Sequence, residues 1–197
     1  NKEDAYEVAR FQDGTLRWSF RNFSPGWGWV NTGIVIPDEG NIWTHIAITY
    51  DETAREVITY INGEEKHKYS VRGSIAVKDT DLRIGNRGLV SQGFHGQIDE
   101  VRIWDRVREA DDIRAYKNKV ISGSTRGLVG YWRFDEGVGS TAMDISQNDN
   151  NGILTSRDNR TQPSRDTDSN IDELNPFANE LEDFVLLLNA SDVDGNL

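Results

Sequence analysis

Six acidic residues occupy positions from which a carboxylate could bind a metal ion. Asp192 and Asp194 belong to the motif Asp-Val-Asp-Gly, whose tight turn would place both carboxylates on one side. The other four stand at the head of an apolar segment and in two later loops: Asp99, Asp135, Glu136 and Asp144. Calcium takes about six to eight oxygens from carboxylates and carbonyls, which glycine-rich acidic loops can supply. The alternative is that all six are ordinary solvated acids.

Two tryptophans, Trp27 and Trp29, lie in the segment 22–33, Asn-Phe-Ser-Pro-Gly-Trp-Gly-Trp-Val-Asn-Thr-Gly. Its glycines and proline indicate a loop. An exposed indole ring on such a loop could stack on a sugar ring and bind carbohydrate. The alternative is that one ring folds back as a lid on the core, because aromatic side chains are usually buried.

The chain carries no recognisable catalytic group. It contains no Ser/His/Asp grouping, phosphate-binding loop or metal-binding helix motif. His45 is predicted to be a packed residue on a strand, since His67 and His95 are too far along the chain to share a ligand spacing with it. The adjacent acids Asp111-Asp112 and Asp135-Glu136 are of the ordinarily solvated kind. We therefore expect a protein that is not an enzyme.

The composition excludes several classes of partner. The 197 residues include 33 acids against 22 lysines and arginines, giving a net charge of -11. The basic residues form no stripe, so neither nucleic acid nor an anionic membrane surface is an expected partner. No apolar run approaches the roughly 20 residues of a membrane span. The chain has no cysteine, which excludes disulfides, thiolate metal sites and a cysteine nucleophile. It does not start with methionine and its first residues do not resemble a signal peptide, so we expect it to be cut from a longer polypeptide.

The element that must position Asp99 is the segment Phe94 to Trp104, which reads as a strand of a two-sheet sandwich. Alternation puts Val101 and Ile103 on the same face as Asp99. Four other side chains are predicted to lie on the opposite face: Ile98, Glu100, Arg102 and Trp104. Glu100 and Arg102 are then neighbours able to pair. A short helix over 109–119 and an aromatic strand over 127–134 are expected to follow.

Two hairpins are predicted upstream. The strands 6–11 and 15–20 flank Gln-Asp-Gly, and the strands 56–61 and 66–71 flank Asn62-Gly63, the strongest short hairpin signal. A further strand covers 43–50. The inward positions of these strands form the predicted core: Trp18, Phe20, Ile46, Ile48, Val101, Ile103, Tyr131, Trp132 and Phe134.

The order strand, short helix, aromatic strand, with the wording Ile-Asp-Glu-Val-Arg-Ile-Trp-Asp and then Gly-Leu-Val-Gly-Tyr-Trp-Arg-Phe-Asp-Glu-Gly, resembles the LamG-like modules of the concanavalin A-like lectin/glucanase superfamily. The resemblance covers about residues 6–154. It implies an all-β fold, an antiparallel two-sheet jelly-roll sandwich. Modules of this kind usually open with two strand motifs that are absent before Tyr6, so we expect missing N-terminal strands and unpaired backbone groups. The resemblance also raises the expectation of a structural calcium ion.

Three regions divide the chain. Residues 1–154 form the LamG-like domain, and 155–178, nearly devoid of apolar residues, are expected to be a disordered linker. Residues 179–197, with the run Phe-Val-Leu-Leu-Leu and the Asp192 motif, resemble the start of a cadherin-like repeat of bacterial surface proteins.

The expected function is a non-catalytic binding module for carbohydrate or an extracellular protein, within a secreted or cell-surface multidomain protein of bacterial type. The first alternative is a structural or adhesive spacer in a repetitive surface protein. A fragment of a glycoside hydrolase is the third. The hydrolases of the superfamily carry Glu-x-Asp-x-x-Glu on one strand, whereas residues 97–100 read Gln-Ile-Asp-Glu without that spacing.

Overall fold

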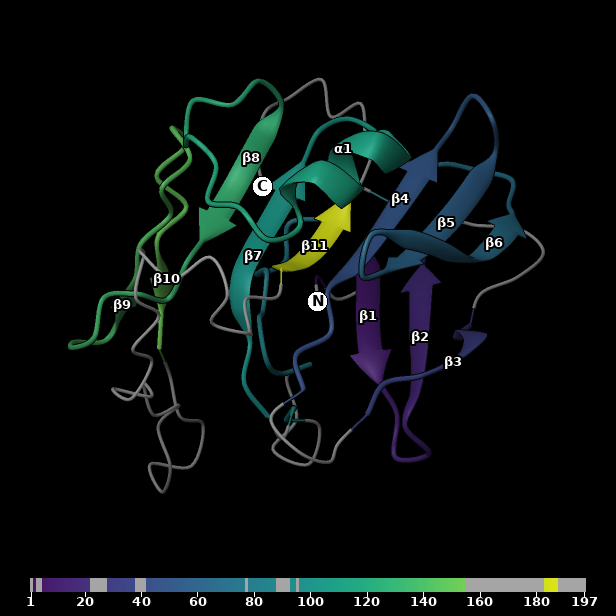
Figure 1. Ribbon diagram of the computed structural model, residues 1–197, viewed down its shortest axis with the longest axis horizontal. Coiled ribbons are helices and arrows are strands. Elements are labelled where there is room, and N and C mark those ends of the chain that lie inside the picture. The colour runs from purple at the N-terminus through teal and green to yellow at the C-terminus, as the bar shows by residue number, and fades with distance from the viewer. Residues whose placement is uncertain are drawn as a thin grey trace.

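The computed structural model describes residues 2, 5–21, 28–37, 42–76, 78–87, 93–94 and 96–154, together with the backbone of 183–187. These residues form β-strands, most of them antiparallel, and one short helix (Figure 1), which confirms the predicted all-β sandwich. The elements have the following bounds: β1 (Tyr6–Arg10), β2 (Thr15–Phe20), β3 (Val30–Val35), β4 (Ile46–Asp51), β5 (Glu56–Ile61), β6 (Glu64–Ser70), β7 (Asp99–Trp104), α1 (Ala110–Tyr116), β8 (Leu128–Trp132), β9 (Thr141–Ala142), β10 (Gly152–Ile153) and β11 (Asp183–Leu187).

A three-stranded sheet has the order β1-β2-β3. Its first hairpin turns at Gly14, whose φ of 78° is one that only glycine adopts at low cost. The strand faces follow the expected alternation, since Leu16, Trp18 and Phe20 all enter one core cluster. The hairpin and its inward face are therefore as predicted.

A six-stranded sheet has the order β6-β5-β4-β11-β7-β8. The β5–β6 hairpin turns through Asn62 and Gly63, both with positive φ, as a two-residue turn between twisted strands requires. The Asn62 side chain also accepts a hydrogen bond from the His45 amide at 2.9 Å, which joins the turn to the residue before β4.

The centre of this sheet contains a strand that the sequence analysis placed elsewhere. β11, from the segment expected to begin a cadherin-like repeat, lies between β4 and β7 and runs parallel to both (Figure 1). β4 and β7 therefore each have a hydrogen-bonded neighbour on both sides. The linker 155–178 lies outside the described residues, and the cadherin-like start stays a prediction.

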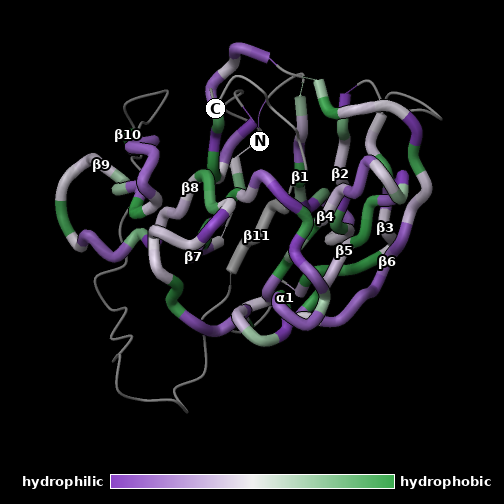
Figure 2. Tube along the Cα trace, turned by 90° about the horizontal axis from the view of Figure 1, so that it is seen from above, coloured by the Kyte–Doolittle hydropathy of each residue, from purple (hydrophilic) through white to green (hydrophobic). Residues whose placement is uncertain are grey.

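Three layers result from these elements. Figure 2 shows α1 and the pair β1–β2 on opposite sides of β4. Between the two sheets lies a cluster that includes Trp18, Phe20, Ile48 and Tyr50. On the opposite face of the six-stranded sheet, α1 buries Ile113 in a second cluster that includes Trp104 and Tyr131.

No helix in the described part of the chain is long and apolar enough to cross a membrane.

A third cluster fills the region of β7 and β8 that the three-stranded sheet does not reach. It joins Val101 and Ile103 to Trp132, with Ala142 of β9 packed against them. Of the nine predicted core residues, seven are buried, while Ile46 and Phe134 are only partly buried. These two lie at the start of a strand and just beyond the end of one, where fewer neighbours cover them.

A bulge interrupts β7 at Glu100. Its φ of 50° is unusual for a residue with a side chain, and its amide donates to the Asp99 carboxylate at 2.9 Å. The extra residue reverses the alternation, so Ile98 packs with Val101 and Ile103, on the face opposite to the one expected from the sequence. Strict alternation failed here because it assumes a regular ladder.

Candidate functional site

A group of side chains on the outer face of the three-stranded sheet, most of them partly exposed, forms the candidate ligand-binding site. Glu7 stands between Tyr6 and Val8, and Arg17 between Leu16 and Trp18, whose side chains all enter the core. Strand alternation therefore directs Glu7 and Arg17 outward. We call the group they join the Trp29 cluster. Its members are Glu7, Phe11, Asp13, Arg17, Trp29 and Arg87.

Ring contacts connect this cluster. Trp29, directly before β3, meets the Phe11 ring edge-on with centroids 5.1 Å apart. The Arg17 guanidinium lies 4.2 Å from the Phe11 centroid, and that of Arg87 lies 5.3 Å from the Trp29 centroid. Both distances are within cation–π range. The rings are thus held at fixed angles while the Trp29 side chain remains only partly buried.

Each arginine of the Trp29 cluster also has an acidic partner. Arg87 pairs with Glu7 at 2.6 Å, and Arg17 pairs with Asp13 at 2.5 Å. The Glu7 side chain is only 8% exposed, so its carboxylate is held in place beneath Arg87. The cluster therefore offers a ring face, fixed donors and fixed acceptors together, and its charges are largely balanced.

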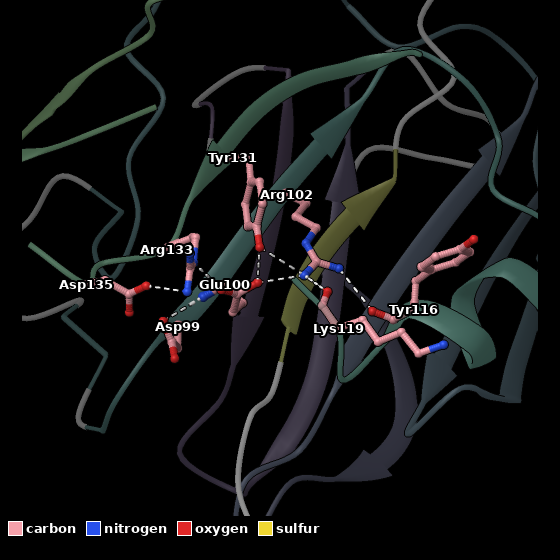
Figure 3. A network of polar contacts seen from close by, with 8 residues as sticks. All are labelled: Asp99, Glu100, Arg102, Tyr116, Lys119, Tyr131, Arg133 and Asp135. Carbon is pink, nitrogen blue, oxygen red and sulfur yellow. Dashed lines mark hydrogen bonds and ion pairs between the residues drawn. The ribbon is translucent and has the colours of Figure 1, made fainter. Parts of the chain in front are cut away.

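A second group of the same residue types lies inside the molecule, under the end of α1 (Figure 3). Glu100, Arg102 and Tyr131 form what we call the buried trio. Arg102 pairs with Glu100 at 2.6 Å, and both side chains are at most 4% exposed. The Tyr131 hydroxyl donates to the Glu100 carboxylate, and its ring lies 4.7 Å from the Arg102 guanidinium.

The buried trio ties the helix to the sheet. The Arg102 guanidinium donates to the backbone carbonyls of Tyr116 and Lys119, at 3.2 and 2.7 Å. These carbonyls stand at and beyond the last turn of α1, where a helix leaves acceptors without internal partners. The pairing of Glu100 with Arg102 was expected from the sequence, but the link to the helix end was not. This arrangement is structural.

The four predicted metal ligands that lie in the described part of the chain do not all gather in one place, although Asp135 is close enough to Asp99 to influence its pKa. Asp135 pairs with Arg133 at 2.6 Å, and Glu136 accepts from the Met143 amide at 2.5 Å. Asp144 is buried and accepts from the amides of Tyr131, Ser146 and Asn150 and from the Ser146 hydroxyl.

Within the described residues, no three His, Cys, Asp or Glu side chains are grouped to hold a metal ion. Asp192 and Asp194 lie outside those residues. A structural calcium ion therefore stays a prediction.

Asp99 and His45 have pKa values moved far from their ordinary range. Burial, with the nearby charges of Glu100 and Asp135, raises the pKa of Asp99 to about 7, against the lowering effect of the Glu100 amide and Arg133. Burial, together with the positive charges of Arg102 and Lys117, lowers the pKa of His45 to about 3. His45 is 1% exposed, which agrees with the packed role expected for it.

Of the two predicted tryptophans, only Trp29 lies among the described residues. Trp29 joins the partly exposed cluster, while Trp27 lies outside the described residues. Sequence reasoning missed Glu7, Arg17 and Arg87 as companions of Trp29. Alternation along the first hairpin could have indicated that Glu7 and Arg17 face outward, but Arg87 is 80 residues from Glu7 and only the tertiary structure joins them.

A comparison with solved structures shows the fold in another protein. A candidate carbohydrate-binding protein from Bacteroides ovatus ATCC 8483 is 23% identical, with a TM-score of 0.62; the match covers 78% of this chain and 45% of that one. The chain thus spans less than half of that structure. An S-layer domain-containing protein from Clostridium thermocellum ATCC 27405 is 20% identical over 57% of each chain, with a TM-score of 0.36. No curated protein matches the sequence.

A family model adds the assignment that the fold alone cannot give. It is a laminin G-type model described as the concanavalin A-like lectin/glucanases superfamily, and it matches residues 1–114. These residues are more than half of the 197 in the chain, and they include the Trp29 cluster and β7. The chain therefore belongs to the concanavalin A-like lectin/glucanases superfamily.

Proposed function

We propose that this chain is a non-catalytic carbohydrate-binding module of a secreted or cell-surface protein. The observation that carries the proposal is the Trp29 cluster, in which a partly exposed indole ring stands beside ion-paired arginines. The family assignment and the carbohydrate-binding description of the Bacteroides ovatus structure support it. A fold hosts many functions, so the side chains of the site must decide.

The chemistry of the cluster suits a neutral sugar. The faces of a sugar ring carry C–H groups that pack on an aromatic face, while its hydroxyls need fixed donors and acceptors. Arg87 and Glu7 supply one donor and one acceptor group beside the Trp29 ring. Because both arginines already have acidic partners, the site has little excess positive charge for a strongly anionic glycan.

The proposal does not assign a catalytic role to the acids. The two carboxylates of a retaining glycosidase stand about 5 to 5.5 Å apart on either side of the bond to be cleaved. Glu100 is enclosed by Arg102, Tyr131 and Arg133, so it cannot reach a substrate without losing those partners. We therefore propose binding without hydrolysis.

A glycan array followed by calorimetry tests this function. We expect the chain to bind at least one neutral glycan, and Trp29→Ala to weaken that binding about fivefold or more, since a stacked aromatic contributes about 1 kcal/mol or more. Tyr116→Ala is the matched control, because Tyr116 is an aromatic residue, 44% exposed, on α1 across the sheet from β1 and β2.

Two results would contradict the proposal. One is an array on which no glycan is bound, which would favour a spacer or a protein-binding role. The other is a Trp29→Ala variant that melts like the original chain and keeps its full affinity, which would move the glycan site elsewhere.

A further inference from the structure

The six-stranded sheet has a slot between β4 and β7 that a separate segment of the chain fills (Figure 1). On one side, Phe184, Val185 and Leu186 stand beside Ile46, Ala47 and Ile48. On the other side, Val185, Leu186 and Leu187 stand beside Arg102, Ile103 and Trp104. Without this strand, β4 and β7 would each present an unpaired backbone edge in the middle of the molecule.

The strand in the slot is joined to the rest of the molecule mainly by these two ladders. Among the described elements, β11 makes extensive contact with β4 and β7 alone. Both pairings are parallel, a form slightly less stable per residue than the antiparallel pairing of β4 with β5 and of β7 with β8. The ladder to β7 also has a register shift between Asp183 and Val185. This shift coincides with the extra residue of β7 at the Glu100 bulge. The contacts of β11 with the described elements are therefore concentrated in its two ladders.

The walls of the slot explain which sequence can occupy it. Ile48 and Ile103 face one side of the sheet, and Ala47 and Trp104 face the other, all of them buried. A strand buried on both faces is apolar at every position, without alternation. The run Phe-Val-Leu-Leu-Leu at 184–188 is the only stretch of residues 155–197 with that composition.

We propose that the slot between β4 and β7 is a peptide-binding site, and that its ligand is this chain's own segment Asp183–Leu187. The ligand class is an extended apolar strand of about five residues, recognised mainly by main-chain hydrogen bonds along both edges, as in β-strand addition. The segment 155–182 tethers this ligand to the sandwich. The site lies on different elements from the Trp29 cluster, so its test is independent of carbohydrate binding.

A designed disulfide tests the occupancy and the source of the strand. The chain has no cysteine, so Ala47→Cys with Val185→Cys introduces the only two, at residues that are direct partners in the sheet. We expect the full chain, refolded under oxidising conditions, to form the disulfide within one chain and to run as a monomer on a non-reducing gel. Each single variant serves as a control, since it can form disulfides only between chains.

The disulfide experiment has two contrary results. If no disulfide forms, the segment does not occupy the slot and the proposal is wrong. If the disulfide joins two chains, the strand comes from a second copy, and the slot is an interface between copies instead of a site for the chain's own segment.

Peptide binding tests whether the slot is a site that can be emptied and refilled. Val185→Pro in the full chain should release the strand, because proline cannot donate to a ladder or fit a central strand. A labelled peptide with the sequence of residues 181–190 should then bind this variant at least about tenfold more tightly than it binds the original chain. Val193→Pro, outside the strand, is the matched control and should leave the slot closed to the peptide.

The same peptide carrying proline at the Val185 position should not bind. The proposal would be wrong if a folded Val185→Pro variant did not bind the peptide. It would also be wrong if the original chain bound the peptide as tightly as this variant does. If Val185→Pro does not fold, the disulfide pair still decides the question.

Discussion

The Trp29 cluster and the buried trio use the same three kinds of side chain at different depths. In the trio, the carboxylate and the guanidinium are 4% and 3% exposed, and a tyrosine completes the group. In the cluster, Glu7 is 8% exposed but its arginine partner is 35% exposed, and the aromatic residue is Trp29. The ion-pair distance is 2.6 Å in both. Distance alone therefore does not distinguish the buried structural pair from the pair in the candidate site.

Burial and the remaining partners do distinguish them. Arg102 donates its hydrogen bonds to Glu100, to Tyr131 and to the backbone carbonyls at the end of α1, all of them groups of the protein. The Trp29 cluster leaves part of its ring and of Arg87 at the surface. A desolvated charge is costly to leave alone, whereas a surface pair contributes little to stability. The two regions should respond to mutation in opposite ways.

The largest expected effect comes from removing the buried cation. Arg102→Met leaves Glu100 without its closest counter-charge and frees the carbonyls after α1, so we expect the free energy of unfolding to fall by about 3 to 5 kcal/mol. Arg87→Met is the matched change in the Trp29 cluster, with an expected loss below about 1 kcal/mol. Urea unfolding measures both. Similar losses in the two variants would remove the distinction between the regions.

The carboxylates sharpen the same comparison. Glu100→Gln keeps the shape of the side chain but weakens charged hydrogen bonds, so we expect a loss of about 2 kcal/mol in stability and no change in glycan affinity. Glu7→Gln should do the reverse, with little change in stability and a lower affinity for the glycan that the original chain binds. Calorimetry with that glycan gives the affinities. A Glu100→Gln variant that melts normally but binds poorly would place Glu100 in the ligand site.

The pH dependence of stability probes the interior beside the buried trio. His45 is neutral in the fold because its pKa is about 3, whereas the unfolded chain has the ordinary value near 6.5. Below pH 6.5 the His45 side chain binds a proton in the unfolded state but not in the folded state. The free energy of unfolding is therefore unaffected by His45 above pH 6.5 and falls by about 1.4 kcal/mol per pH unit as the pH drops toward 3.

His45→Gln should remove this part of the pH dependence. Urea unfolding of both proteins between pH 7 and pH 4 gives the difference. A difference that stays constant over this range would show that His45 can be protonated in the fold, and that the surroundings of Arg102 are more hydrated than the structure indicates.

The smallest expected effect concerns calcium. We predict that millimolar calcium raises the melting temperature by a few degrees, since a ligand of the native state stabilises it by mass action, and that Asp99→Asn abolishes the rise. Asp144→Asn should lower stability equally with and without calcium, because four protein donors already engage its carboxylate. Identical melting temperatures of the original chain in calcium and in chelator would show that the folded chain is not stabilised by calcium.

The sequence by itself determined the longer strands β1, β2, β4, β5, β6, β7 and β8, the turns of two hairpins and most of the inward faces. It did not predict β9 and β10, and it placed residues 30–33, which begin β3, in a loop. Asn62-Gly63 and Gly14 could be assigned to turns because positive φ restricts the choice of residue, and Trp18 and Ile48 could be assigned to the core because side chains alternate along a strand. The pairing of Glu100 with Arg102 was predicted too, as was Trp29 as a candidate ligand residue. All of these depend on local geometry.

The tertiary structure alone decided the contacts between distant parts of the chain. It brought Arg87 to Glu7 and Trp29, the carbonyls of Tyr116 and Lys119 to Arg102, and the segment 183–187 into the slot between β4 and β7. It also introduced the bulge at Glu100, which reversed the expected face of Ile98. Residue periodicity reports only how a strand presents its side chains. Which strand lies beside it depends on the packing of the whole chain, and no local pattern contains that information.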